Sequence, residues 1–231
     1  MKIKKIKIMN IKKLLKFLSE LKENNNRNWF NENKNIYNEL RNEFLIMVQI
    51  LIDKISEFDS DVIGLNTEDC VFRIYRDIRF SLDKSPYKTN FGAFIARGGR
   101  KIERAGYYVH FEPSECFLAG GIYRPSNDIL KKIRSEIYYN IDEFIGIIED
   151  KTFKRYFKNI DGEKLVKVPA GFPVDFEYSD LLKYKSYNIV YDMDEKFLND
   201  RQLIEKIINV FKLMYPFNKF INDAIDSDKI N

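Results

Sequence analysis

The chain has 231 residues with a formal net charge of +4, and 45% of them are hydrophobic and 15% aromatic. This length supports one sizeable core, and the apolar content excludes an intrinsically disordered chain. No apolar run approaches the roughly 18 residues of a membrane-spanning helix, and the basic start lacks the apolar stretch of a signal peptide. The sequence therefore predicts a single cytoplasmic domain over residues 1–231, with residues 1–9 as a poorly ordered basic N-terminus.

Two helical stripes open the chain. Residues 10–24 carry apolar side chains at helical spacing after Asn10, a suitable N-cap, and a second stripe follows from Ile36 to Ile55. The pair predicts a helical hairpin. The intervening segment NNNRNW has two interpretations. Either Arg27 and Trp29 stand at a helix start whose free N–H groups attract an anion, or the segment is a polar turn with Trp29 packed in the core.

The apolar period changes from about 3.6 to 2 between Val71 and Arg124, which predicts antiparallel strands joined by short turns. We expect a strand over 71–80, two strands around Gly98-Gly99, and a turn at 112–115 that leads into another strand. Gly120-Gly121 interrupts this strand. The two glycines indicate either a β-bulge or a close approach of the backbone to a ligand.

The C-terminal half returns mainly to helical spacing. A helix is expected after Ser126 or Asn127, a strand over 187–193, and a helix from about Asp200 that bends or stops near Pro216. The resulting fold class is α+β. A central antiparallel sheet should have the N-terminal helical hairpin and the C-terminal helices packed around it.

Arginines are concentrated in one part of the chain: six of the twelve lie within residues 73–104. If residues 71–80 form a strand, Arg76 shares a face with apolar side chains, and a cation there needs an internal acid or a ligand. Arg73, Asp77 and Arg79 occupy the other face. That row is either a solvated ladder of ion pairs or part of a binding site.

The turn that follows adds more positive charge than negative charge. Arginine forks, lysines and hydroxyl groups together are typical of phosphate sites. We therefore expect an anion site that binds a phosphate-bearing molecule, either a nucleotide-like metabolite or a nucleic-acid strand. Its predicted residues are Arg73, Arg76, Arg79, Lys84, Tyr87 and Lys88. The alternative is a non-enzymatic interaction module whose basic face docks an acidic protein partner.

Whether the chain is an enzyme stays open at this point. Phosphoryl transfer or hydrolysis would use the arginines for electrostatic stabilisation, with Asp77 or Asp83 as base or metal ligand. His110, the only histidine, is a further catalytic candidate, although a lone strand histidine is more often a structural hydrogen-bonding group. No cofactor is predicted. A Mg²⁺ ion stays an alternative, because carboxylates on or near the sheet could bind it. Cys70 and Cys116 lack metal-ligand spacing and are expected to be reduced core thiols.

Several motifs together resemble the uncharacterised bacterial family called domain of unknown function 2461. The central motif is R-x-x-R-D-x-R-F-x-x-D-K-x-x-Y from Arg73 to Tyr87, and NNNRNWF, GYYVHFEP, GGIYRP, KVPAGF and LLKYKSY also fit. Leu82 departs from the lysine expected there. The resemblance implies a cytoplasmic single-domain protein and supplies no reaction, because the family has no established activity.

Overall fold

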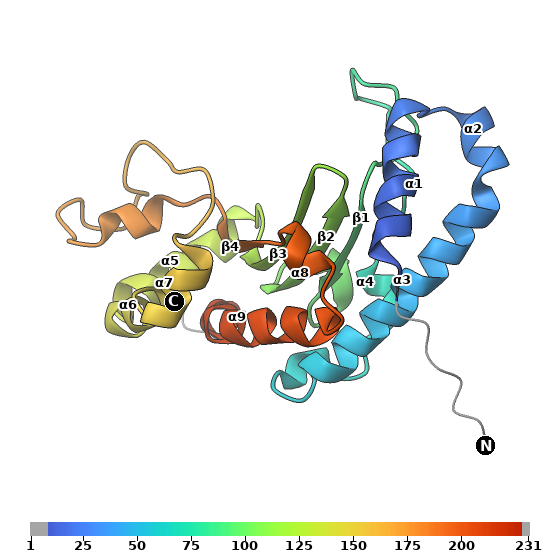
Figure 1. The fold of residues 1–231 in the computed structure, drawn as a ribbon. Helices are drawn as coiled ribbons and strands as arrows, with labels where there is room; N and C mark the ends of the chain where they lie inside the picture. Colours follow the sequence, from blue (N-terminus) through green and yellow to red (C-terminus); the bar gives the residue numbers. More distant parts are fainter. Residues whose placement is uncertain (1–8, 228–231) are drawn as a thin grey trace.

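A four-stranded antiparallel sheet lies at the centre of the computed structural model, which describes residues 9–227 (Figure 1). Its strands follow chain order and are β1 (Phe91–Ile95), β2 (Gly106–Glu112), β3 (Glu115–Ile122) and β4 (Tyr187–Asp192). Helices precede the sheet and follow it, so the α+β fold class is confirmed. All but the final residue of the predicted N-terminal segment 1–9 lies outside the described residues.

The N-terminal helical hairpin forms as predicted, with a short helix at its bend. It consists of α1 (Ile11–Glu23), α2 (Arg27–Glu32) and α3 (Lys34–Ile55). The Asn10 side chain accepts a hydrogen bond from the Lys13 N–H at 3.0 Å, which caps α1. The Trp29 ring packs 5.7 Å from the ring of Phe17. The segment NNNRNW therefore contains the start of α2: the Asn26 side chain accepts a hydrogen bond from the Trp29 N–H at 3.0 Å, and the Trp29 ring packs against the core.

One face of the sheet is covered by α9 (Leu203–Asp226), and α3 packs against its β1 and β2 strands through Phe44. The Phe44 ring of α3 lies 6.2 Å from that of Phe111, and the Phe211 ring of α9 lies 5.2 Å from that of Tyr107. Fully burying one such side chain contributes about 1.5–3 kcal/mol. The strand residues on this face are buried: Ala93, Ile95, Tyr107, Val109, Phe111, Leu118, Tyr187 and Ile189.

Of the two alternatives at Pro216, a bend or a stop, the stop is wrong, because α9 continues through this proline to Asp226. The apolar stripe persists beyond Pro216, and Phe217, Phe220 and Ile221 are buried. Packing of these side chains offsets the cost of roughly 3 kcal/mol for proline inside a helix. The C-terminal helices that complete the fold are α5 (Asn127–Tyr139), α6 (Ile141–Ile148), α7 (Lys151–Phe157) and α8 (Glu195–Leu198).

Gly120 and Gly121 form no bulge, since the pairing of β3 with both neighbours is continuous through them. A Cβ atom on Gly120 would lie 3.0 Å from the Cβ and sulfur of Met214 on α9. Gly121 has a φ of 104°, and a Cβ atom there would lie 1.9 Å from the Tyr187 carbonyl oxygen. The glycines therefore allow the close approach of α9 and of β4.

Two buried asparagines attach α9 to the sheet. Asn218 accepts a hydrogen bond from the Gly121 N–H at 2.7 Å and donates one to the Gly106 carbonyl at 3.0 Å. One turn later, Asn222 makes the same pair of bonds with the N–H and carbonyl groups of Ala105, at 2.9 and 3.1 Å. These side chains satisfy backbone groups at the start of β2 and the end of β3, so they fix the position of the helix.

The strand predicted over 71–80 is wrong. The segment makes only isolated bridges, Val71 with Ala93 and Tyr75 with Tyr87. Pro86 in the opposing segment lacks an N–H group, and beyond Arg76 the chain loses its partner. There the Asp77 carboxylate accepts a bond from the Arg79 N–H at 3.3 Å, a local turn contact. The predicted apolar face therefore breaks up, and Phe80 is 96% exposed.

Among the described residues, no helix has both the length and the apolar character that crossing a membrane requires. The two cysteines are free: Cys70 is buried and Cys116 is half-buried. Burial raises the pKa of the Cys70 thiol to about 11, so this thiol is unreactive at neutral pH.

Candidate functional site

A cleft of about 1150 Å³ lies on the sheet face opposite α9. The strand residues that alternate with the buried set point outward, because successive side chains of a strand face opposite sides. These residues form the floor of the cleft and are half-buried: Phe94, Tyr108, Phe117, Ala119 and Val190. The walls are loops, with residues 100–104 in one wall and residues 123–125 in another.

Three rings follow one another along this floor, and we call Phe72, Tyr108 and Phe117 the aromatic row. The Phe72 and Tyr108 rings meet edge to face at 6.1 Å, and those of Tyr108 and Phe117 are 5.7 Å apart. All three residues line the cleft. A planar group can stack on such a surface, which favours ligands that contain an aromatic ring.

Positive charge stands at one end of the aromatic row. The Lys88 amine lies 5.1 Å from the centre of the Phe72 ring, and the Arg100 guanidinium carbon lies 6.0 Å from it. Arg100 also donates a hydrogen bond to the Glu68 carbonyl at 2.7 Å, which fixes its side chain. Within residues 9–227 neither cation forms an ion pair. Burial, followed by repulsion from Arg73 and Arg100, lowers the pKa of Lys88.

Arg76 also lines the cleft, but it has an internal partner. Its guanidinium forms an ion pair with the Asp83 carboxylate and donates a hydrogen bond to the Ser81 hydroxyl at 3.3 Å. Hydrogen bonds from the Ser85 hydroxyl and N–H, and then from Arg76, hold the pKa of Asp83 well below its usual range. Of the two options left open for Arg76, the internal acid is the one observed.

The other predicted residues of the anion site do not line the cleft. Arg79 pairs with Asp77 at 2.6 and 2.9 Å on the exposed loop, and the Lys84 amine donates to the Ile78 carbonyl at 3.1 Å. Tyr87 is buried with its ring stacked 3.9 Å from that of Phe30. Arg73 is exposed and is not among the residues lining the cleft. Of the six predicted residues, the structure thus brings only Arg76 and Lys88 to the cleft.

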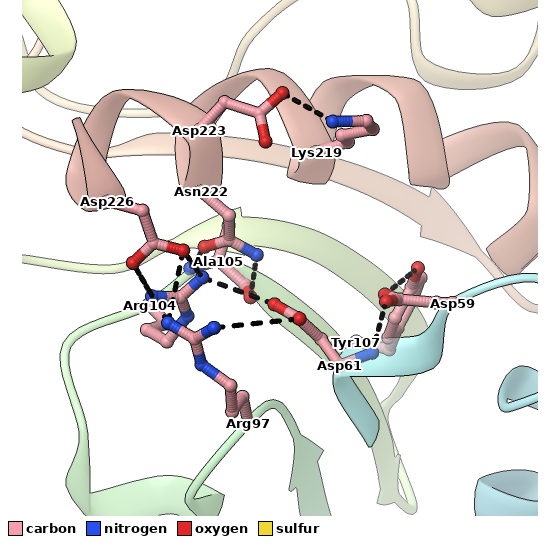
Figure 2. Close-up of polar contacts among 10 residues, drawn as sticks. All are labelled: Asp59, Asp61, Arg97, Arg104, Ala105, Tyr107, Lys219, Asn222, Asp223 and Asp226. Carbon is pink, nitrogen blue, oxygen red and sulfur yellow. Dashed lines mark hydrogen bonds and ion pairs between the residues drawn. The ribbon is translucent and has the colours of Figure 1, made fainter. Parts of the chain in front are cut away.

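Arg104 reaches the cleft from a network of ion pairs at its edge (Figure 2). Its buried guanidinium contacts Asp226 at 2.5 and 2.8 Å and Asp61 at 3.2 Å. Arg97 joins the same two carboxylates, at 2.8 Å from Asp226 and 3.7 Å from Asp61. These charges compensate one another, so the network holds α9 in place rather than offering charge to a ligand.

His110 shares the outer face of β2 with Tyr108 and Glu112, as the strand period predicts. Its Nδ1 atom lies 2.8 Å from the Tyr108 hydroxyl, and its Nε2 atom lies 3.3 Å from a Glu112 carboxylate oxygen. Thr89 donates a hydrogen bond to the other Glu112 oxygen at 2.7 Å. The imidazole stacks on Phe117 at 4.6 Å. This hydrogen-bonded chain holds the Tyr108 side chain in place from the neighbouring positions on the same strand face.

The described part of the chain contains no group of three or more His, Cys, Asp or Glu side chains that could hold a metal ion. The carboxylates suggested as bases are both held by cations. Hydrogen bonds from Arg79 lower the pKa of Asp77 to about 2, and Asp83 is similarly acidic. Such groups are weak general bases near pH 7.

Sequence reasoning did not identify the aromatic row or Arg100 as site residues. A signal for Arg100 was present, because it belongs to the arginine-rich segment 73–104. Tyr108 and Phe117 were recognisable as aromatic residues on one face of their strands. Which face stays open depends on where α3 and α9 pack, and the local pattern does not contain that information.

The described fold defines the chain as an α+β protein built on a central antiparallel sheet, with its cleft on the face opposite α9. The chain belongs to the family described as conserved hypothetical protein (DUF2461), whose family model matches residues 13–220. The resemblance in the motif from Arg73 to Tyr87 is thereby confirmed. No curated protein and no solved structure matches the chain.

Proposed function

We propose that the cleft binds a phosphate-bearing molecule with a planar ring, either a nucleotide-like metabolite or a nucleic-acid strand. The observation that carries the proposal is the pair of cations, Lys88 and Arg100, at the end of the aromatic row. Two cations without acidic partners repel each other, and an anion between them would remove that repulsion. The ligand supplies the negative charge that the described residues do not.

Aromatic and basic groups in this arrangement suit two parts of one ligand. A base or other planar ring would stack on Tyr108 or Phe117, while its phosphate group reaches Lys88 and Arg100. The volume of about 1150 Å³ exceeds the roughly 300–1,000 Å³ of common small-molecule pockets, so an extended ligand also fits. The proposal includes electrostatic stabilisation of a phosphoryl group, and it assigns no base because Asp77 and Asp83 are held in ion pairs.

The test compares two lysine variants. In Lys88→Met the charge at the aromatic row is lost. Lys212→Met is the matched control, because the Lys212 amine also lies over a phenylalanine ring, at 5.7 Å from the Phe58 ring centre, outside the cleft. Calorimetric titrations and thermal shifts would use nucleoside phosphates, sugar phosphates and short oligonucleotides. We expect binding by the wild type and the control, and at least a tenfold loss in Lys88→Met, about 1.4 kcal/mol.

The same titrations distinguish a nucleotide-like metabolite from a nucleic-acid strand as the ligand. A nucleic-acid strand predicts affinity that falls steeply with salt and rises with oligonucleotide length, whereas a metabolite predicts saturable binding without length dependence. If no phosphate compound binds the wild type, or if both variants bind equally well, the proposal is wrong.

The docking of an acidic protein partner is the second candidate, and the exposed loop favours it. Phe80 and Leu82 are 96% and 102% exposed there, beside Arg79 and Lys84. Exposed apolar side chains flanked by cations are typical of contact residues in protein interfaces. A Phe80→Ser/Leu82→Ser double variant would abolish partner capture while leaving phosphate binding in the cleft unchanged.

A further inference from the structure

Lys88 occupies an unusual position for a lysine. Its side chain is half-buried at the boundary between the main cleft and an adjoining hollow of about 330 Å³, and it lines both. The amine lies over the Phe72 ring, 5.1 Å from its centre, and no carboxylate of residues 9–227 forms an ion pair with it. Most surface lysines instead extend their amine into water or toward an acid.

The surroundings of this amine disfavour its protonated form. Burial is the main cause that lowers the pKa of Lys88, and repulsion from Arg73 and Arg100 adds to it. Two further charges in the wall are already compensated, because Arg76 pairs with Asp83 and Asp77 pairs with Arg79. A desolvated lysine beside other cations loses its proton more readily than a surface lysine, which raises the neutral, nucleophilic fraction of its amine.

We propose that Lys88 is a nucleophilic amine that forms a Schiff base with the carbonyl group of an anionic substrate bound in the cleft. The proposal rests on the proposed function, because Arg100, which lines the same cleft, would hold the anionic group of that substrate. The Nζ lone pair attacks the carbonyl carbon, and the electrons of the C=O π bond move to oxygen. A proton passes from nitrogen to that oxygen, giving a carbinolamine. Loss of water then breaks the C–O bond and leaves the imine.

Pyridoxal 5′-phosphate is the first probe, since it carries an aldehyde and a phosphate group. After brief exposure and borohydride reduction, peptide mass spectrometry reads which lysines are labelled. We expect Lys88 to be labelled several-fold faster than Lys101, which lines the same cleft but is exposed. Inorganic phosphate should slow this labelling. Lys88→Arg should remove the fast-labelled site while retaining a positive charge at this position.

A neutral probe separates the two parts of the proposal. Formaldehyde with cyanoborohydride methylates amines without needing an anion site, and its pH profile reports the neutral amine of each lysine. If Lys88 reacts at lower pH than Lys101 but pyridoxal phosphate labels the two lysines equally, the anion site beside Lys88 is refuted. The nucleophilic character of the Lys88 amine is then still supported. If the two lysines have the same profile while phosphate still binds, the Schiff-base proposal is overturned and the proposed function survives.

Discussion

Arg104 and Asp226 form a two-pronged ion pair between residues 122 positions apart in the sequence. The Arg104 side chain is 4% exposed, whereas that of Asp226 is 46% exposed. One member is therefore a buried charge whose partner stands at the C-terminal end of α9 (Figure 2). The contact joins the connection between β1 and β2 to the end of the helix that covers their sheet.

Asp226→Asn should lower the free energy of unfolding by about 1–3 kcal/mol, because the buried guanidinium loses its charged partner. Urea denaturation measures this change. Asp223→Asn is the matched control: it lies one turn earlier on α9 and pairs at the surface with Lys219 at 2.5 Å. A surface pair contributes at most about 1 kcal/mol. Equal destabilisation by the two substitutions would contradict the role given to Arg104.

The same pair predicts a dependence of stability on pH. Hydrogen bonds from Arg104 are the main cause that lowers the pKa of Asp226. The unfolded chain, with an aspartate pKa near ~3.9, therefore binds more protons in acid than the folded chain does. The stabilisation is present above that pH and is lost as the pH falls through the folded pKa. Urea midpoints between pH 5 and pH 2 should decline less steeply in Asp226→Asn; an unchanged slope would refute the assignment.

Gly121→Ala should destabilise the fold by more than about 2 kcal/mol. Its φ of 104° disfavours any side chain, and the new Cβ atom would collide with the Tyr187 carbonyl. Gly146→Ala in α6 is the contrasting substitution, because nothing lies within 4 Å of a Cβ atom there. It should stabilise the helix by about 0.5–1 kcal/mol. Thermal unfolding tests both predictions: the Tm should fall in Gly121→Ala and rise in Gly146→Ala.

Asp83→Asn should strengthen phosphate binding a few-fold, since it frees the Arg76 guanidinium in the wall of the cleft. Isothermal titration with inorganic phosphate or a nucleoside monophosphate measures the effect. Asp223→Asn is the control, because it also removes one negative charge but at a position on α9; it should leave the phosphate affinity unchanged. Weaker or unchanged binding in Asp83→Asn would mean that Arg76 does not face the ligand.

The helices and the strands from Phe91 to Ile122 were predictable because their apolar spacing matches the structure that they form. The segment 71–80 was not, since its alternating pattern finds no continuous partner strand opposite Pro86. For Arg76 the sequence predicted that the cation needs either an internal acid or a ligand. The structure shows that its partner is Asp83, seven residues later in the same motif. The cleft depends on packing between distant elements, so its floor at Tyr108 and its cation at Arg100 could not be assembled from local patterns.

The covering of the sheet by α9 has a consequence for synthesis on the ribosome. β3 ends at Ile122, while α9 begins at Leu203, so about 80 residues separate the completed hairpins from the helix that buries Tyr107. At the usual rate of roughly 5–20 residues per second, several seconds pass before that helix emerges. Throughout this interval the part of the apolar sheet face that α9 will bury stays uncovered in the nascent chain, where chaperones that bind emerging polypeptides can reach it.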